Sequence, residues 1–167
     1  MKGKGKIILA IGGVLALGLC IWLWPVVRAL MKVGLPGEAE MRQYEASNAN
    51  NLRAIHTALM LYHENEDRFP DGAGWMDAIS GLIRANDMTE EEAAKKLRDP
   101  RLKGQGYGYA LNEAAAGKYK ADAGPPSTPL VFNSSDSKRN AHGDPAKLKP
   151  TQGGQAITIE GQIVPLK

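Results

Sequence analysis

Apolar and polar positions divide the chain into a long uncharged stretch, a helical pattern and several short β-like runs. The uncharged stretch covers residues 7–27, which are 21 positions without a formal charge. A helix of this length rises roughly 30 Å, the thickness of the hydrocarbon core of a bilayer. The pattern therefore predicts a transmembrane helix over residues 7–31, preceded by a cytoplasmic basic tail over residues 1–6.

Charged and aromatic residues around this stretch predict its orientation. Trp22 and Trp24 lie near its C-terminal end, where indole rings favour the membrane interface. Three lysines precede the stretch, whereas two basic residues and then two acidic ones follow it: Lys2, Lys4, Lys6, Arg28, Lys32, Glu38 and Glu40. The end of a membrane helix that is flanked by more Lys and Arg stays on the cytoplasmic side. We expect a single-pass protein of a bacterial inner membrane, with a cytoplasmic N-terminus and a periplasmic or otherwise extracytoplasmic domain over residues 32–167.

Two other kinds of N-terminal segment also contain an apolar stretch, a cleaved signal peptide and a lipoprotein anchor. A cleaved signal peptide has a shorter apolar core and a small-residue cleavage site, and no clear A-x-A pattern follows this one. A lipoprotein anchor at Cys20 would require a small residue before it, where Leu19 stands. An uncleaved anchor is therefore favoured, with cleavage as the alternative.

The helical pattern runs from about residue 38 to residue 66. Its apolar stripe is Leu52, Ile55, Leu59 and Tyr62, with Ala58 beside it, and spacings of three and four place these on one face. Pro36 between Gly34 and Gly37 should break or bend the chain before this helix, and Pro25 should bend it near the membrane exit. Pro70 and Gly72 should end the second helix. The charged residues Arg42, Glu45, Arg53 and Glu64 are expected on its wet face.

Short elements follow the long helix. The patterns predict a short amphipathic helix over residues 74–86 and a second one over residues 89–97, begun by a capping box at Thr89. Strands are predicted over residues 107–111, 129–133, 156–159 and 162–165, the last two joined by a two-residue Glu160-Gly161 turn. Residues 134–154 are predicted to form one long loop. Helices followed by strands indicate an α+β fold, in which a small antiparallel sheet of three or four strands covers the long helix.

Composition and charge narrow the classes of function. The net charge of the 167 residues is +3, but residues 1–32 carry +5, which leaves −2 on the rest. The domain beyond the anchor therefore has no basic face, and no nucleic-acid partner is expected. The single cysteine excludes an internal disulfide framework and a cysteine-based zinc site.

The sequence offers few candidates for catalytic or metal-binding residues. His56 and His63 lie two helical turns apart, a spacing more typical of two partly exposed polar residues than of a metal pair. Asp136, His142 and Asp144 could hold calcium in the 134–154 loop, but Lys138 and Arg139 oppose a cation there, and a solvated loop is favoured. Neither a G-x-S-x-G elbow nor a glycine-rich phosphate loop occurs. We expect no catalytic, cofactor-binding or metal residues, no small-molecule substrate and no enzymatic activity.

Three stretches carry a resemblance to a known family. Residues 51–62 read Asn-Leu-Arg-Ala-Ile-His-Thr-Ala-Leu-Met-Leu-Tyr, residues 68–70 read Arg-Phe-Pro, and residues 107–112 contain Tyr-Gly-Tyr followed by Asn112. These resemble the type IV pilin and type II secretion pseudopilin class, in particular the planctomycete-type prepilin-like proteins. The resemblance implies a pilin-like α+β fold, in which the transmembrane helix continues into an amphipathic helix packed on the sheet.

The resemblance also implies a role. Pseudopilin-like and minor pilin-like proteins are structural subunits of type II secretion or type IV pilus systems, so the expected partners are the lipid bilayer and other pilin or pseudopilin subunits. The chain departs from the family at the head of the apolar stretch, because residues 4–9 contain no Phe-Thr pair and no acidic residue and thus no recognisable prepilin cleavage motif. A membrane-anchored binding module that has a pilin-like fold and does not polymerise is therefore the alternative.

Overall fold

A computed structural model describes residues 24, 36–84, 88–102, 106–150 and 153–166. The chain divides into two units, Met1–Gln43 and Tyr44–Lys167. Apart from Trp24, the predicted transmembrane segment 7–31 and its bend at Pro25 lie outside the described residues. Among the described residues, no helix has both the length and the apolar character that crossing a membrane requires.

The long helix predicted from the apolar stripe is α2, Pro36–Glu66. Leu52, Ile55, Ala58 and Leu59 are fully buried, which confirms the stripe, whereas Tyr62 is only partly buried. After Glu66 the chain leaves the helix at Asp67, whose φ of 60° is left-handed. Three residues later comes Pro70, one of the two residues predicted to end the helix, and it is buried.

Within the ranges that the structure describes, five strands form one sheet in the order β3-β1-β2-β4-β5. Their bounds are β1 Tyr109–Asn112, β2 Pro129–Asn133, β3 His142–Gly143, β4 Gln155–Thr158 and β5 Ile163–Pro165. The β1–β2, β2–β4 and β4–β5 pairs are antiparallel, and β1–β3 is parallel. The fold is therefore α+β, with a mixed sheet.

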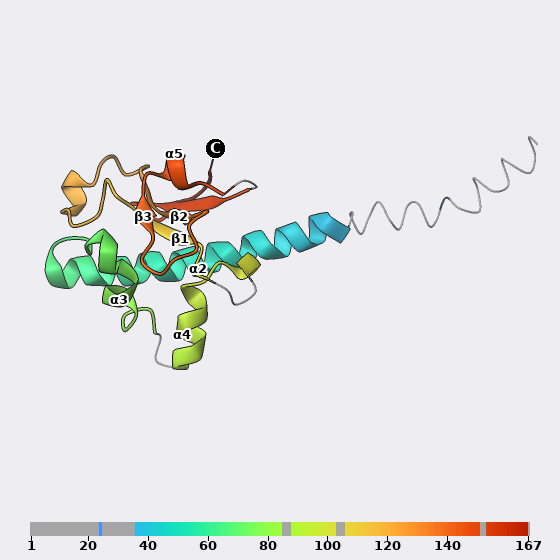
Figure 1. Cartoon of the computed structure of the whole chain (residues 1–167), viewed down its shortest axis with the longest axis horizontal. Coiled ribbons are helices and arrows are strands. Elements are labelled where there is room, and N and C mark those ends of the chain that lie inside the picture. Colours follow the sequence, from blue (N-terminus) through green and yellow to red (C-terminus); the bar gives the residue numbers. More distant parts are fainter. Residues whose placement is uncertain (1–23, 25–35, 85–87, 103–105, 151–152, 167) are drawn as a thin grey trace, which may run out of the picture. The chain divides into compact units, whose positions relative to one another are not determined.

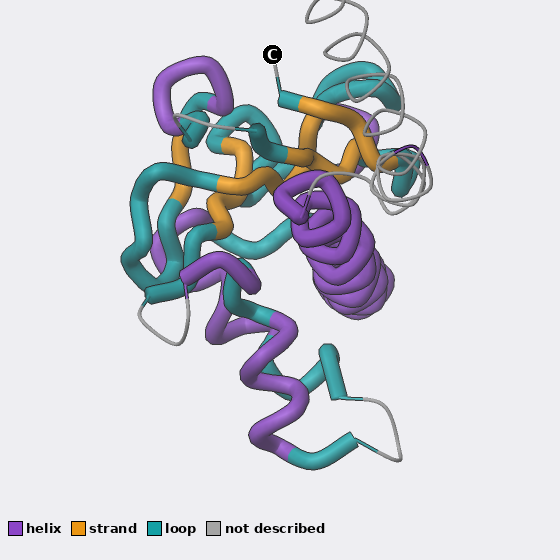
Figure 2. Tube along the Cα trace, turned by 90° about the vertical axis from the view of Figure 1, so that its right-hand side faces the viewer, coloured by secondary structure: helices purple, strands orange, loops and turns teal. Residues whose placement is uncertain are grey.

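Side chains on the two faces of the sheet belong to two different cores. Leu111, Val131 and Ile157 are opposite one another on neighbouring strands and pack in the larger core with the buried stripe of α2. The other face carries Ala110, Phe132 and Ala156, with the short helix α5, Pro145–Leu148, over it. Figures 1 and 2 show α2 along one face of the sheet. Successive side chains along each strand point to opposite faces of the sheet, so the two cores together bury both faces.

The prediction of a small antiparallel sheet with one long loop was wrong in two respects. The sheet is mixed, because β3 lies parallel to β1: the amide of Leu111 donates to the carbonyl of Ala141 at 3.0 Å and that of Glu113 to Gly143 at 3.1 Å. Moreover, the 134–154 region contains both β3 and α5. A two-residue strand with one polar side chain is too short to leave an alternating apolar pattern, so tertiary pairing alone creates it.

The predicted C-terminal hairpin is present, with a longer turn than expected. The amide of Thr158 donates to the carbonyl of Gln162 at 2.9 Å, so three residues separate the last paired positions. Gly161 has a φ of 86°, the left-handed conformation that ends a three-residue hairpin loop. The glycine was correctly placed in the turn, and the turn's length was underestimated by one residue.

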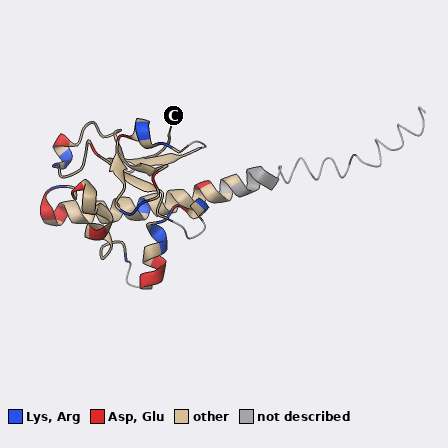
Figure 3. Ribbon diagram, in the orientation of Figure 1, with Lys and Arg blue, Asp and Glu red and all other residues tan. Residues whose placement is uncertain are grey.

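Besides α5, the described residues form two more short helices and three 3-10 turns. The helix predicted over 74–86 is shorter, α3 Trp75–Ile79, after the turn η1 Gly72–Gly74. The second is α4, Glu90–Lys96, whose capping box at Thr89 is confirmed, because Thr89 and Glu92 bond each other's backbone amides. Acidic residues begin α4 and lysines end it (Figure 3), in the order that the helix dipole favours. The remaining turns are η2 Pro100–Leu102 and η3 Lys120–Asp122.

Candidate functional site

A buried cluster of polar side chains joins α2 to the sheet. At its centre is Asn48, which has no exposed surface. Its amide nitrogen donates to Asn133 Oδ1 and to Gln155 Oε1, both at 2.8 Å. Its amide oxygen accepts from the Tyr109 hydroxyl at 2.7 Å and from Asn133 Nδ2 at 3.0 Å. The side chain thus uses both its donors and both its acceptor sites, which orients α2 on β1, β2 and β4.

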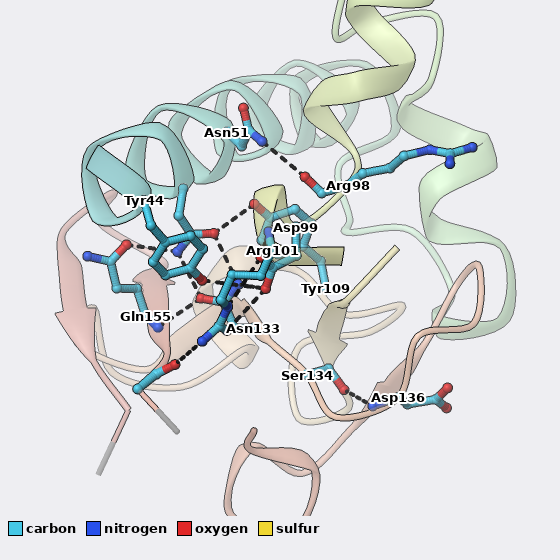
Figure 4. Close-up of polar contacts among 12 residues, drawn as sticks. Tyr44, Asn51, Arg98, Asp99, Arg101, Tyr109, Asn133, Ser134, Asp136 and Gln155 are labelled. Carbon is cyan, nitrogen blue, oxygen red and sulfur yellow. Dashed lines mark hydrogen bonds and ion pairs between the residues drawn. The ribbon is translucent and has the colours of Figure 1, made fainter. Parts of the chain in front are cut away.

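Asp99 extends this cluster toward the segment that follows α4. Its Oδ2 accepts from Asn133 Nδ2 at 2.9 Å and lies 3.1 Å from Arg101 Nη2, and the Tyr44 hydroxyl donates to it at 3.5 Å. The guanidinium carbon of Arg101 lies 4.4 Å from the centre of the Tyr44 ring. Figure 4 shows these side chains converging, with Asn51 donating beside them to the carbonyl of Arg98 at 3.1 Å.

Burial and charge keep both tyrosines of the cluster protonated. Burial is the main cause that raises the pKa of the Tyr44 and Tyr109 hydroxyls above the ordinary value, and the negative charge of Asp99 raises it further. Both hydroxyls therefore act as donors. Among the described residues, no buried side-chain nitrogen or oxygen lacks a hydrogen-bond partner. With its members bonded to one another, the cluster is suited to stabilising one position of α2 on the sheet.

Sequence reasoning missed this cluster, although one signal was available. Asn48 lies four residues before Leu52 and so falls on the apolar stripe of α2. Asparagine is a poor helix former, and on a buried helical face it must find a partner. Its partners Tyr109, Asn133 and Gln155 come from distant parts of the chain, so their convergence could not be read from spacing.

A second polar cluster fastens α3 to the segment before β3. Arg139 Nε donates to Asp77 Oδ1 at 2.7 Å, and Asn140 Nδ2 donates to Asp77 Oδ2 at 2.6 Å. The bond from Asn140 is the main cause that lowers the pKa of the Asp77 carboxyl, with Arg139 next. Trp75 Nε1 also donates to the carbonyl of Ala141 at 2.8 Å. Much of what was predicted as a solvated loop is therefore tied to α3.

The three candidate calcium ligands serve separate local turns. Asp136 Oδ1 accepts from the amide of Lys138 at 2.9 Å, and Asp144 Oδ1 caps α5 by accepting from the amide of Ala146 at 2.9 Å. His142 Nδ1 lies 3.1 Å from the carbonyl oxygen of Asn140. Across the part of the chain that the structure describes, no three His, Cys, Asp or Glu side chains gather in a way that could hold a metal ion. The structure does not bring these residues together.

An open groove of about 850 Å³ lies beside the C-terminal end of α2. Its lining includes His63, Tyr119, Lys120, Pro126, Ile159 and Glu160. Of the two predicted histidines of α2, His63 lines the groove and His56 does not; both are partly buried, as expected. The ring Nε2 of His56 lies 3.1 Å from the carbonyl oxygen of Ile159, and the backbone amide of Lys120 donates to His63 Nε2 at 3.2 Å. The histidines therefore bond backbone groups of the groove.

Replacing His56 by glutamine should make the free energy of unfolding depend less on pH. Burial is the main cause that lowers the pKa of His56 from its ordinary value of 6.5. As the pH falls through that value, the unfolded chain binds a proton that the folded chain still excludes, so folding loses stability until the lower folded pKa is reached. We expect the free energy of unfolding of H56Q to fall less than that of the wild type between about pH 7 and about pH 5.5. Urea unfolding of the full chain in detergent measures both slopes, and equal slopes would contradict the assignment.

Comparison of the chain with protein-family models, curated proteins and solved structures gives no match.

Proposed function

We propose that this protein is a membrane-anchored structural or assembly subunit, a pseudopilin-like or minor pilin-like component of a type II secretion or type IV pilus system. The observation that supports it best is the packing of α2: one face of this 31-residue helix is fully buried at Leu52, Ile55 and Leu59, in one core with the sheet. In a pilin-like subunit, the helix that follows the membrane segment carries the sheet in this way. The hydrogen bonds of Asn48 to Asn133 and Tyr109 also attach α2 to the sheet.

The proposal places the chain in the bacterial inner membrane. The uncharged residues 7–27 would form the anchor, residues 1–6 the cytoplasmic tail and residues 32–167 the extracytoplasmic domain. The work of such a subunit is non-covalent: the anchor keeps it in the bilayer, and the domain contacts other pilin or pseudopilin subunits. The proposal includes no catalysis, no nucleic acid and no small-molecule substrate.

A non-polymerising, membrane-anchored binding module with the same fold is the second candidate. The sequence of residues 4–9 favours it, because the segment lacks the Phe-Thr pair and the acidic residue of a prepilin cleavage site. The groove beside the end of α2 would give such a module a concave surface.

Processing and assembly distinguish the two candidates. The full chain is expressed in a bacterium that carries a prepilin peptidase, membranes are extracted, and the mature N-terminus is sequenced. Cleavage after Gly3 or Gly5 together with recovery in sheared filaments supports the assembly subunit. An intact Met1 and a monomer in detergent support the binding module. Full-length protein in the soluble cytoplasmic fraction would contradict both.

A pair of charge variants tests the anchor itself. Leu15→Lys with Leu19→Lys places two ammonium groups in the predicted membrane segment, each at a cost of about 3 kcal/mol at the bilayer centre. We expect the double variant to lose most of its membrane association in carbonate-washed fractions. Asn50→Lys with Thr57→Lys is the matched control, because both side chains are exposed on α2, and it should remain in the membrane. Equal fractionation of the two double variants would remove the support for an anchor.

A further inference from the structure

Two histidines of α2 tie two segments of the groove, far apart in the sequence, to the same helix. His56 reaches the turn after β4 through the carbonyl of Ile159, and His63 reaches the first residue of η3 through the amide of Lys120. Ile159 and Lys120 both line the groove. Two imidazoles that lie two turns apart on one helix therefore bond two of the segments that line the groove.

The two hydrogen bonds respond differently to protonation. His56 faces a carbonyl oxygen, so its Nε2 carries the hydrogen and donates, which a neutral and a protonated imidazole can both do. His63 faces an N–H group, so its Nε2 must present a lone pair. A protonated imidazole has no acceptor atom. Protonation of His63 would therefore set its Nε2–H against the backbone N–H of Lys120, whereas His56 meets no such conflict.

We propose that His63 is an acid-sensitive latch of the groove, which holds the 119–121 segment on α2 when neutral and releases it when protonated. The bonds from Asp122 to Tyr119 and from Ala123 to Lys120 lie within the segment itself. On either side the chain stays anchored, through the bond from Phe69 to Lys118 at 2.8 Å and through the buried Ala123. The movement is thus confined to a short stretch between two fixed points.

The ring of His63 lies 5.2 Å from that of Phe69, at an interplanar angle of 52°. The charged and titratable residues that line the groove with His63 are Asp67, Tyr119, Lys120 and Glu160. Others lie on the same elements: His56, Glu64 and Glu66 on α2, and Asp122 on η3. His56 keeps its donor bond in either protonation state, so a pH-dependent change at the Lys120 amide is assigned to His63.

Residue-resolved amide exchange of the full chain in detergent micelles tests the latch, with rates corrected for the intrinsic effect of pH. Between about pH 7.5 and about pH 5.5 the protection of the Lys120 amide should fall about five- to tenfold, the loss expected for one hydrogen bond. His63→Gln should remove this step, because the glutamine side chain stays neutral at both pH values. His56→Gln is the matched control on the same helix and should retain the step.

Two results would overturn the proposal: equal protection of the wild-type Lys120 amide at both pH values, or a full wild-type step in the His63→Gln variant. A titration by nuclear magnetic resonance gives an independent measurement on the unmodified chain. The His63 ring and the Lys120 amide should shift with a common midpoint, and separate midpoints would also refute the latch.

Discussion

Replacing Asn48 by alanine is expected to lower the free energy of unfolding by about 3 kcal/mol. The substitution removes four hydrogen bonds at once and leaves the buried Tyr109 hydroxyl without its Asn48 acceptor, whereas Asn133 keeps its bonds to Asp99 and to the amide of Gln155. A buried polar group that loses its partner has no access to water in compensation. Urea unfolding of the full chain in detergent, followed by circular dichroism, measures the loss.

Asn50→Ala is the matched control for this variant. Asn50 lies two residues further along α2, is exposed, and accepts a single bond from Arg53 at 3.3 Å. Both substitutions replace asparagine by a better helix former, so the gain in helix propensity cancels in the comparison. We expect the control to change stability by less than about 0.5 kcal/mol. Similar losses in the two variants would show that the cluster does not fasten α2 to the sheet.

If the Asn48 variant does not fold, Gln155→Ala gives a milder test. Gln155 is half-buried and contributes one side-chain bond to Asn48. Its removal leaves the other three bonds of Asn48 in place, so a loss of about 1 kcal/mol is expected. An unchanged stability would mean that this edge of the cluster contributes nothing.

Replacing Trp75 by alanine should lower the free energy of unfolding by about 4 kcal/mol. The indole is fully buried in the larger core. Its Nε1 also donates to the carbonyl of Ala141, which precedes β3, so the variant loses both packing and a fastening of the parallel strand. The same unfolding measurement, combined with amide exchange of residues 141–143, separates the global effect from the local one.

Two further substitutions show which part of the effect is packing. Trp75→Phe keeps an aromatic ring but lacks the indole N–H, and it should cost about 1–2 kcal/mol with faster exchange at β3. Tyr119→Ala removes an aromatic side chain that is 60% exposed and should change stability by less than about 0.5 kcal/mol. If Trp75→Ala were as mild as Tyr119→Ala, the α3 region would not belong to the core.

Much of the helical and strand content could be predicted from local patterns. The stripe of Leu52, Ile55 and Leu59 is buried as its spacing indicated, and α4 begins at its capping box. The strands β2 and β4 were also placed to within a residue. These predictions succeeded because the period of apolar residues and the chemistry of a cap are local properties of the chain.

Features that depend on distant segments were missed. Gly72 was predicted only as a stop for the helix, but a Cβ atom at this position would lie 2.6 Å from the ring of His142, on β3. The parallel pairing of β3, the polar cluster around Asn48 and the bond from Lys120 to His63 likewise join segments separated by tens of residues. A short stretch of sequence contains only one of the two residues in such a contact, so a local pattern does not reveal the contact.

By itself, the sequence determined a long uncharged segment at residues 7–27, an amphipathic helix after it and an α+β domain in which the apolar side of that helix is covered. It did so because the burial of apolar surface requires apolar residues at the regular spacing of a helix or a strand, and this spacing is visible in the sequence. Only the tertiary structure decided which polar groups meet inside the domain, which strand is parallel and where the groove lies. Hydrogen bonds are directional and short, so their partners are selected when the backbone brings distant atoms within about 3 Å of each other.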